Sequence, residues 1–229
     1  MLELRQGKAR GGFDFGWLNT RHSFSFGDYY DPDRMEFGSL RVLNEDIVQP
    51  GQGFGTHGHR DMEILTWVLE GALEHRDSLG TQGVIRPGKA QIMSAGTGIR
   101  HSEFNASQTD PVHLLQIWIL PERQGLTPRY DQQRFEAEAL QDRWCLLASR
   151  QGPVTLYQDA RVSVARMSPG TRLALPLVNG RQGYVHVARG KVELGAWSLT
   201  AGDAVVVDAP IDDALVATEP SEVLCFDLA

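Results

Sequence analysis

Short apolar runs separated by turn residues dominate the chain, and few segments carry a helical period. Glu70 and Gly71 form a tight reversal between two such runs. This pattern is typical of an antiparallel all-β protein. In the first half, we predict strands at residues 64–69, 72–75, 84–85, 91–93, 99–104 and 112–120.

The second half repeats the pattern of the first. Apolar positions around Gly190 and Gly202 coincide with those around Gly71 and Gly88 when the two halves are aligned. A more polar stretch between them includes a predicted short helix at 135–140. We therefore predict two β-barrels of related design, with an N-terminal domain at 1–125, a connector at 126–143 and a C-terminal domain at 144–229.

Composition and charge argue against nucleic-acid-binding, membrane and disulfide-rich secreted proteins. The 229 residues carry a formal charge of −7, and a surface of that sign repels phosphate backbones and anionic lipid. No apolar run reaches the roughly 18 residues that span a bilayer, and no signal peptide is visible. The two cysteines, Cys145 and Cys225, are too few for a disulfide framework. We expect a cytoplasmic protein that binds neither nucleic acid directly nor a membrane.

Imidazole and carboxylate groups cluster at two short motifs in the first half. His57 and His59 are two positions apart, so they share one face of an extended strand, and His101 and Glu103 do the same. Four such groups facing into one barrel form a site for a divalent transition metal, because neutral imidazole and carboxylate suit Fe, Mn, Ni, Cu and Zn. His22, His75, His113 and His186 are interpreted instead as structural residues.

These motifs resemble those of the pirin family of bicupins. Gly51, His57, His59, Glu63 and Gly71 have the spacing of the first cupin motif, and Gly98, His101 and Asn105 have that of the second. The strings at 53–63, 93–103, 24–32 and 116–121 also resemble pirins. The similarity is greatest to the short bacterial pirin-like proteins described as quercetin 2,3-dioxygenases. It implies two antiparallel jelly-roll-type barrels.

The resemblance bears on the carboxylate ligand. General cupins take their glutamate from the first motif, where Glu63 stands, whereas pirins take it from the second, where Glu103 stands. Glu103 also shares its strand with His101. We therefore predict His57, His59, His101 and Glu103 as metal ligands, and Glu63 as a group that orients a ligand histidine.

The internal repeat predicts that only the N-terminal barrel binds metal. The positions aligned with His57 and His59 are Pro176 and Val178, and gaps of one or two residues are allowed. Those aligned with His101 and Glu103 are apolar as well, Leu215 and Ala217. The C-terminal domain is therefore expected to be a degenerate cupin without metal ligands.

The resemblance implies an oxidoreductase similar to quercetin 2,3-dioxygenase. Fe(II) is the expected cofactor, although Zn, Ni, Mn, Cu or Cd could occupy the site in a purified sample. The expected substrates are a small aromatic compound such as quercetin and O2, and the heterocycle would open with release of CO. Glu103 is a candidate catalytic residue, because it could take the substrate's hydroxyl proton.

Two other functions remain open at this point. The first is an iron-dependent, redox-sensing regulatory protein of the pirin type, which would act through a protein partner without turnover. The second is a zinc-holding sugar isomerase of the cupin type, whose activity would persist without O2.

Overall fold

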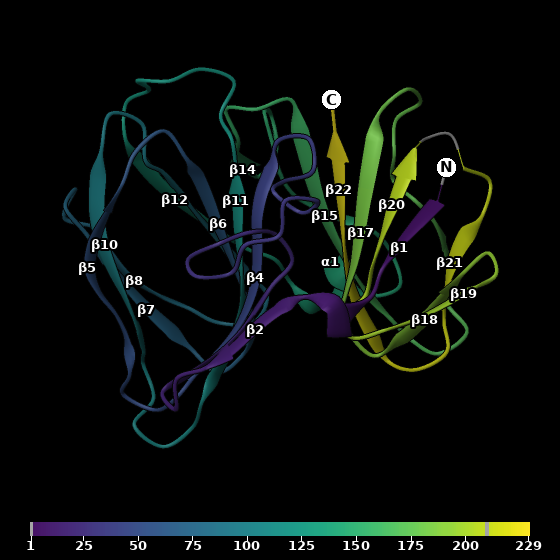
Figure 1. The fold of residues 1–229 in the computed structure, drawn as a ribbon, viewed down its shortest axis with the longest axis horizontal. Helices are drawn as coiled ribbons and strands as arrows, with labels where there is room; N and C mark the ends of the chain where they lie inside the picture. The colour runs from purple at the N-terminus through teal and green to yellow at the C-terminus, as the bar shows by residue number, and fades with distance from the viewer. Residues whose placement is uncertain (1, 209–210) are drawn as a thin grey trace. The chain divides into compact units, whose positions relative to one another are not determined.

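The computed structural model describes residues 2–208 and 211–229 and confirms the predicted all-β class (Figure 1). The described residues contain one short α-helix, α1 (Ala137–Leu140), which lies inside the predicted segment, and one turn of 3-10 helix at Gly7–Ala9. No described helix has the length and apolar character that crossing a membrane requires.

The chain forms two compact units whose boundaries differ from those expected from sequence. The N-terminal unit comprises residues 11–134 and 154–158, and the C-terminal unit comprises residues 1–10, 135–153 and 159–229. Strand β12 (Arg129–Arg134) falls in the predicted connector but pairs with β9 (Lys89–Ser94) of the N-terminal unit. Strand β1 (Leu2–Arg5) pairs with β20 (Ala204–Asp208), which places the start of the chain in the C-terminal unit (Figure 1).

The N-terminal unit is a sandwich of two antiparallel sheets. Its larger sheet has the order β12-β9-β6-β11-β4-β3-β2, and its smaller sheet has the order β5-β10-β7-β8. Buried Val68 and Leu114 of the larger sheet pack with Leu73 and Ile85 of the smaller one. The remaining bounds are β2 (Gly11–Asp14), β3 (Leu18–His22), β4 (Leu40–Val48), β5 (Gly53–His59), β6 (Glu63–Glu70), β7 (Leu73–Asp77), β8 (Gln82–Ile85), β10 (Ile99–Asn105) and β11 (Val112–Ile119), and the unit also holds β14 (Val154–Thr155).

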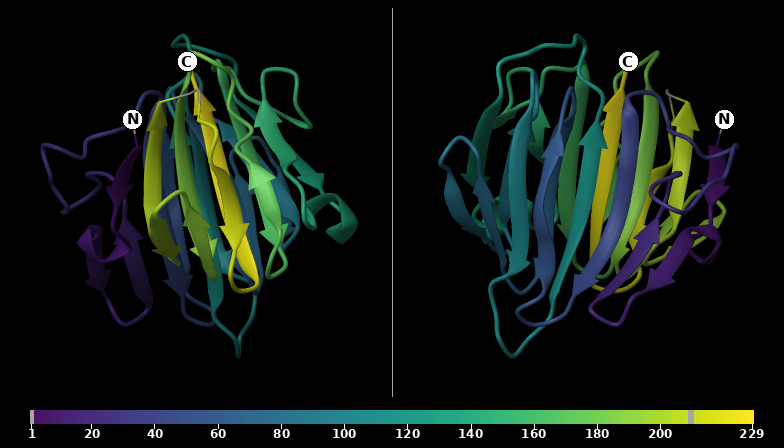
Figure 2. Two further views of the ribbon diagram at one scale, coloured as in Figure 1. Left: turned by 90° about the vertical axis from the view of Figure 1, so that its right-hand side faces the viewer. Right: turned by 60° about the vertical axis from the view of Figure 1, so that its left-hand side comes forward.

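The C-terminal unit has the same construction. Its larger sheet includes the order β1-β20-β17-β22-β15-β13, and its smaller sheet has the order β16-β21-β18-β19. Strand β22, which runs to the C-terminus, lies between β17 and β15 in both views of Figure 2. The bounds are β13 (Cys145–Ser149), β15 (Ala160–Met167), β16 (Arg172–Ala174), β17 (Gln182–Arg189), β18 (Lys191–Leu194), β19 (Trp197–Thr200), β21 (Ala214–Ala217) and β22 (Ser221–Leu228).

The strand orders confirm the internal repeat. The series β9-β6-β11-β4 and β5-β10-β7-β8 corresponds strand for strand to β20-β17-β22-β15 and β16-β21-β18-β19. Gly71 and Gly190 also correspond, since both have positive φ and a Cβ at either would meet a proline carbonyl. Among the described residues, each unit has the jelly-roll fold that the resemblance implied, and its larger and smaller sheets are not joined by a continuous ladder into a closed barrel.

We predict that Gly71→Ala destabilises the protein more than Gly80→Ala. Both glycines have positive φ, 81° and 86°, but a Cβ at Gly71 would lie 2.7 Å from the carbonyl oxygen of Pro111, whereas a Cβ at Gly80 meets nothing within 4 Å. Backbone strain alone costs about 1–2 kcal/mol. We expect Gly71→Ala to exceed its control by at least ~1 kcal/mol in urea unfolding, and equal losses would contradict the steric argument.

Candidate metal centre

The site is built on the antiparallel pair β5 and β10. Their register places His101 directly opposite His57, with a bulge between His101 and Glu103. Side chains of β10 alternate, so that His101 and Glu103 are buried while Phe104 is 38% exposed. The structure therefore places His101 and Glu103 on the same, interior side of β10, as their spacing of two residues predicted.

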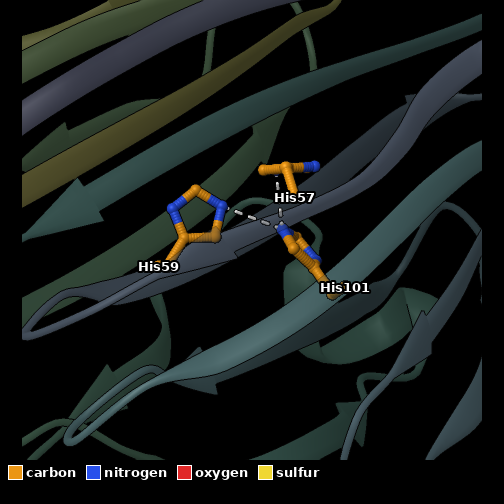
Figure 3. A group of neighbouring side chains, drawn as sticks. All are labelled: His57, His59 and His101. Carbon is orange, nitrogen blue, oxygen red and sulfur yellow. Dashed lines mark hydrogen bonds between the residues drawn. The ribbon is translucent and has the colours of Figure 1, made fainter.

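Three histidine rings point toward one another (Figure 3). The Nε2 atom of His101 lies 3.0 Å from Nε2 of His59 and 3.1 Å from Nε2 of His57. Metal–imidazole bonds measure about 2.0–2.1 Å. Nitrogens about 3 Å apart are therefore spaced as neighbouring ligands of one ion.

The three rings present lone pairs to their common centre. The Nδ1 atom of His57 lies 2.8 Å from the carbonyl oxygen of Gly55. Because a carbonyl only accepts, Nδ1 carries a proton, and in the neutral ring Nε2 then keeps its lone pair. Burial, and then His57, lower the pKa of His59 to about 4, and the same causes together with His59 and His75 lower the pKa of His101 to about 2. Neutral imidazole is the form that binds metals.

A second histidine–carboxylate pair lies behind His101. His75 is fully buried, with Nε2 3.0 Å from Oδ2 of Asp77 and Nδ1 3.5 Å from Nδ1 of His101. Burial lowers the pKa of His75, although Asp77 acts in the opposite direction. Since Asp77 accepts the Nε2 proton, Nδ1 of His75 can accept from Nδ1–H of His101. The sequence analysis treated His75 as structural, and the overlooked signal was Asp77 two residues later on the same strand face.

Glu103 lines the same cavity but belongs to a second group. Its Oε1 lies 4.0 Å from Nδ1 of His75 and has no hydrogen-bond partner, while Oε2 accepts a 2.6 Å hydrogen bond from Gln116. Potential ligand atoms of His75, His101 and Glu103 lie within 4.8 Å of one another, as do those of His57, His59 and His101. Burial, and then the charge of Asp46, raise the pKa of Glu103 to about 8. A nearby cation would relieve this cost.

We had expected Glu63 to orient a ligand histidine, but its carboxylate instead holds a backbone segment. Its Oε2 accepts a 2.8 Å hydrogen bond from the backbone N–H of Tyr157. Asp61 has a φ of 50°, which breaks the extended chain between His59 and Glu63. Glu63 consequently begins β6 of the larger sheet, and the alternation of β5 does not extend to it.

A cavity opens beside the histidines. Phe26, Phe54 and Trp118 form apolar walls, and the Trp118 ring packs edge-on against His59 at 4.9 Å between centroids. Their position depends on how separate strands meet, which no local pattern reports.

The donor set fits a divalent transition metal. Three neutral nitrogens converge beside a buried carboxylate oxygen that lacks a partner, and such a buried group is costly unless something binds it. In the C-terminal unit, Leu215 pairs with Leu194 as Glu103 pairs with His75, so Leu215 occupies the place of Glu103. The alignment had placed it opposite His101, and the shift of two residues is within the gap that we allowed. Both ligand groups found among the described residues lie in the N-terminal unit.

Comparison with known proteins agrees with this architecture. The family model of Pirin matches residues 3–119, and that of the quercetinase C-terminal cupin domain matches residues 146–228. The chain is 43% identical to the quercetin 2,3-dioxygenase of Escherichia coli K12, over 100% of this chain and 99% of that protein.

Solved structures of pirin and of quercetin 2,3-dioxygenase share the fold of this chain. The crystal structure of the bacterial pirin YhhW from Escherichia coli, in complex with nickel(II), has a TM-score of 0.93 and 43% identity, covering 100% of this chain and 99% of that one. A quercetin 2,3-dioxygenase from Acinetobacter baumannii has a TM-score of 0.80 at 20% identity, covering 99% of this chain and 78% of that one, which shows a shared fold. With both of its halves matched and its histidine cluster in place, this chain belongs to the pirin family.

Proposed function

We propose that this protein is a metal-dependent dioxygenase that opens the heterocycle of flavonols such as quercetin. One O2 adds, two ring bonds to the carbon that bears the 3-hydroxyl break, and that carbon leaves as CO. The observation that carries the proposal is the convergence of three histidine Nε2 atoms at an aromatic-walled cavity. The names of the 43% identical relatives support the same reaction.

We assign the metal to His57, His59 and His101, with Glu103 as the fourth ligand through its unpartnered Oε1. We expect Fe(II) as the native ion. When bound, it would supply Lewis acidity toward the flavonol oxygens and a redox centre for O2. The three histidines give the ion a neutral donor set, so that Glu103 would contribute the one protein charge among these ligands.

Glu103 has a second role as acceptor of the substrate's 3-hydroxyl proton. It lines the cavity, and its Oε1 has no hydrogen-bond partner, whereas Oε2 accepts from Gln116. Gln116 thus holds the carboxylate in one orientation, and the two lone pairs of Oε1 would serve the two roles, one facing the ion and the other accepting the proton. A proton acceptor must lie within hydrogen-bond reach of its donor, and a substrate hydroxyl bound beside Glu103 in this cavity would meet that condition.

The apolar walls position the substrate and exclude water. Phe26, Phe54 and Trp118 present ring faces and edges that suit a flat aromatic compound. The T-shaped contact between Phe26 and Trp118, at 5.2 Å between centroids, keeps both rings in place. Exclusion of water strengthens the interactions of Glu103 inside the cavity.

His75 and Asp77 act as positioning residues for His101. Asp77 fixes the proton of His75 on Nε2, so His75 Nδ1 is left as the acceptor for His101. This arrangement holds the His101 ring with its Nε2 lone pair toward His57 and His59. Carboxylate–histidine pairs behind a metal ligand commonly contribute in this way.

Replacement of His101 by alanine should abolish both metal binding and flavonol turnover. We expect at least a tenfold loss of bound metal after Fe(II) reconstitution, with no O2 uptake or CO release from quercetin. The matched control is His113→Ala, which removes a histidine paired with Glu45 outside the cluster. A wild-type protein that binds iron but never consumes quercetin would contradict the dioxygenase, and would direct attention to redox-dependent partner binding.

Two substitutions distinguish the role of Glu103 as metal ligand from its role as proton acceptor. Glu103→Gln keeps an oxygen ligand but removes the basic carboxylate, so metal content should stay near one equivalent while kcat falls by about 10²–10⁴. Glu103→Ala removes the ligand as well and should lower metal content too. Equal kcat for wild-type and Glu103→Gln proteins at matched metal content would exclude the proton-acceptor role.

Asp77→Asn should weaken metal binding without disrupting the fold. The amide can donate as well as accept, so the tautomer of His75 is no longer fixed, while its oxygen can still accept from the amides of Leu79 and Thr81. We expect a roughly 10–100-fold rise in the dissociation constant for Zn(II), measured by competition with a chromogenic chelator. An unchanged affinity would show that His75 does not orient His101.

A further inference from the structure

A second cavity continues from the first, away from the histidines. It shares four lining residues with the metal cavity: Phe26, Asn44, Asp46 and Phe54. We call this second cavity the side chamber. Because the four shared residues border both cavities, they can contact a ligand that lies in either one.

The walls of the side chamber are aromatic. Phe13 stacks on Phe15 with ring centroids 5.9 Å apart, and His22 contacts Phe13 at 5.6 Å and Phe26 at 5.3 Å. Phe26 in turn meets Trp118, which packs against His59. The aromatic surface is thus continuous from a metal-ligand histidine to Phe15.

Phe15 marks the outer end of this surface. It is 55% exposed, although it is a large apolar ring. An exposed aromatic ring that continues a row of cavity-lining rings is typical of a binding-site rim. Flat aromatic surfaces of this kind favour a planar ring as ligand.

Polar groups occur where the two cavities join. Asn44 is 3% exposed, and its Oδ1 is buried without a hydrogen-bond partner. Asp46, also buried, is hydrogen bonded to the side chain of Thr20. A buried amide oxygen without a partner is costly, and it would be satisfied by a ligand hydroxyl. A hydroxyl-bearing ring therefore matches this junction better than a purely apolar one.

We propose that the side chamber is the subsite for the hydroxylated phenyl ring that is attached to the enol-bearing ring system of the flavonol. This inference rests on the proposed function, because it places the enol-bearing ring at the three histidines. The attached ring then lies between Phe13, Phe26 and Phe54, and its hydroxyl donates to Asn44 Oδ1. Asn44 and Phe15 are specificity-determining residues in this arrangement.

Three compounds with the same enol group test the assignment. Quercetin carries a dihydroxylated phenyl ring, 3-hydroxyflavone carries an unsubstituted one, and 3-hydroxychromone has none. Asn44→Leu should lower kcat/KM for quercetin by about tenfold and leave 3-hydroxyflavone and 3-hydroxychromone unchanged. Phe15→Ala should raise KM by about three- to tenfold for quercetin and 3-hydroxyflavone, and not for 3-hydroxychromone.

The matched control is Tyr30→Ala, which removes another exposed aromatic ring, 72% accessible, that lines neither cavity. Binding is measured separately from turnover, by tryptophan fluorescence quenching of the Zn(II)-loaded full chain. Circular dichroism checks that each variant folds. If Asn44→Leu does not fold, Phe15→Ala alone tests the proposal.

The outcomes distinguish the two proposals. If no flavonol is turned over but Phe15→Ala still weakens binding of quercetin and not of 3-hydroxychromone, the side chamber stands and the dioxygenase fails. If quercetin is turned over and the variants affect all three compounds equally, the side chamber is wrong and the dioxygenase stands. Failure of the Zn(II)-loaded protein to bind quercetin more tightly than 3-hydroxychromone would also overturn the side chamber.

Discussion

The antiparallel register between β5 and β10 is the constraint on which the candidate site depends. It sets His101 opposite His57, and the i, i+2 spacing then brings His59 to the same face. A slip of one residue would turn every side chain of a strand to the opposite face of the sheet. The local bulge after His101 changes the pairing before Glu103, which lines the same cavity and also contacts His75 and Gln116.

Desolvation explains why these groups need one another. Burial opposes charge on His59, His101 and Glu103 alike, so it lowers the pKa of the two imidazoles and raises that of the carboxyl. Converging lone pairs and an unpartnered carboxylate oxygen are unfavourable inside a protein unless a cation binds between them. The polar interior of this unit is thus explained as a binding site for a cation. His75 and Asp77 continue the hydrogen-bonded chain behind His101.

The two units show how one architecture serves two purposes. Their strand orders match, but the interior of the C-terminal unit is filled by aliphatic side chains, with Leu215 and Ala217 of β21 in its core cluster. On the corresponding strand β10 of the N-terminal unit, His101 and Glu103 line a cavity. Close packing in one unit and a polar cavity in the other differ by a few residues on equivalent strands. Function therefore depends on the side chains of the site and not on the fold alone.

The sequence by itself determined the all-β class, the internal repeat and the candidate ligands, because strand periodicity and glycine turns are local properties of the chain. Tertiary structure alone decided which groups meet. The pairing of β7 with β10 places His75 against His101. The turn at Asp61 directs the chain so that Glu63 binds the backbone of Tyr157 and not a ligand histidine. It also placed β1 and β12, since an edge strand takes whichever sheet offers unpaired backbone groups. The cavities belong to this second kind of information, because the space between Phe26, Asn44 and Phe54 exists only once three distant segments have packed.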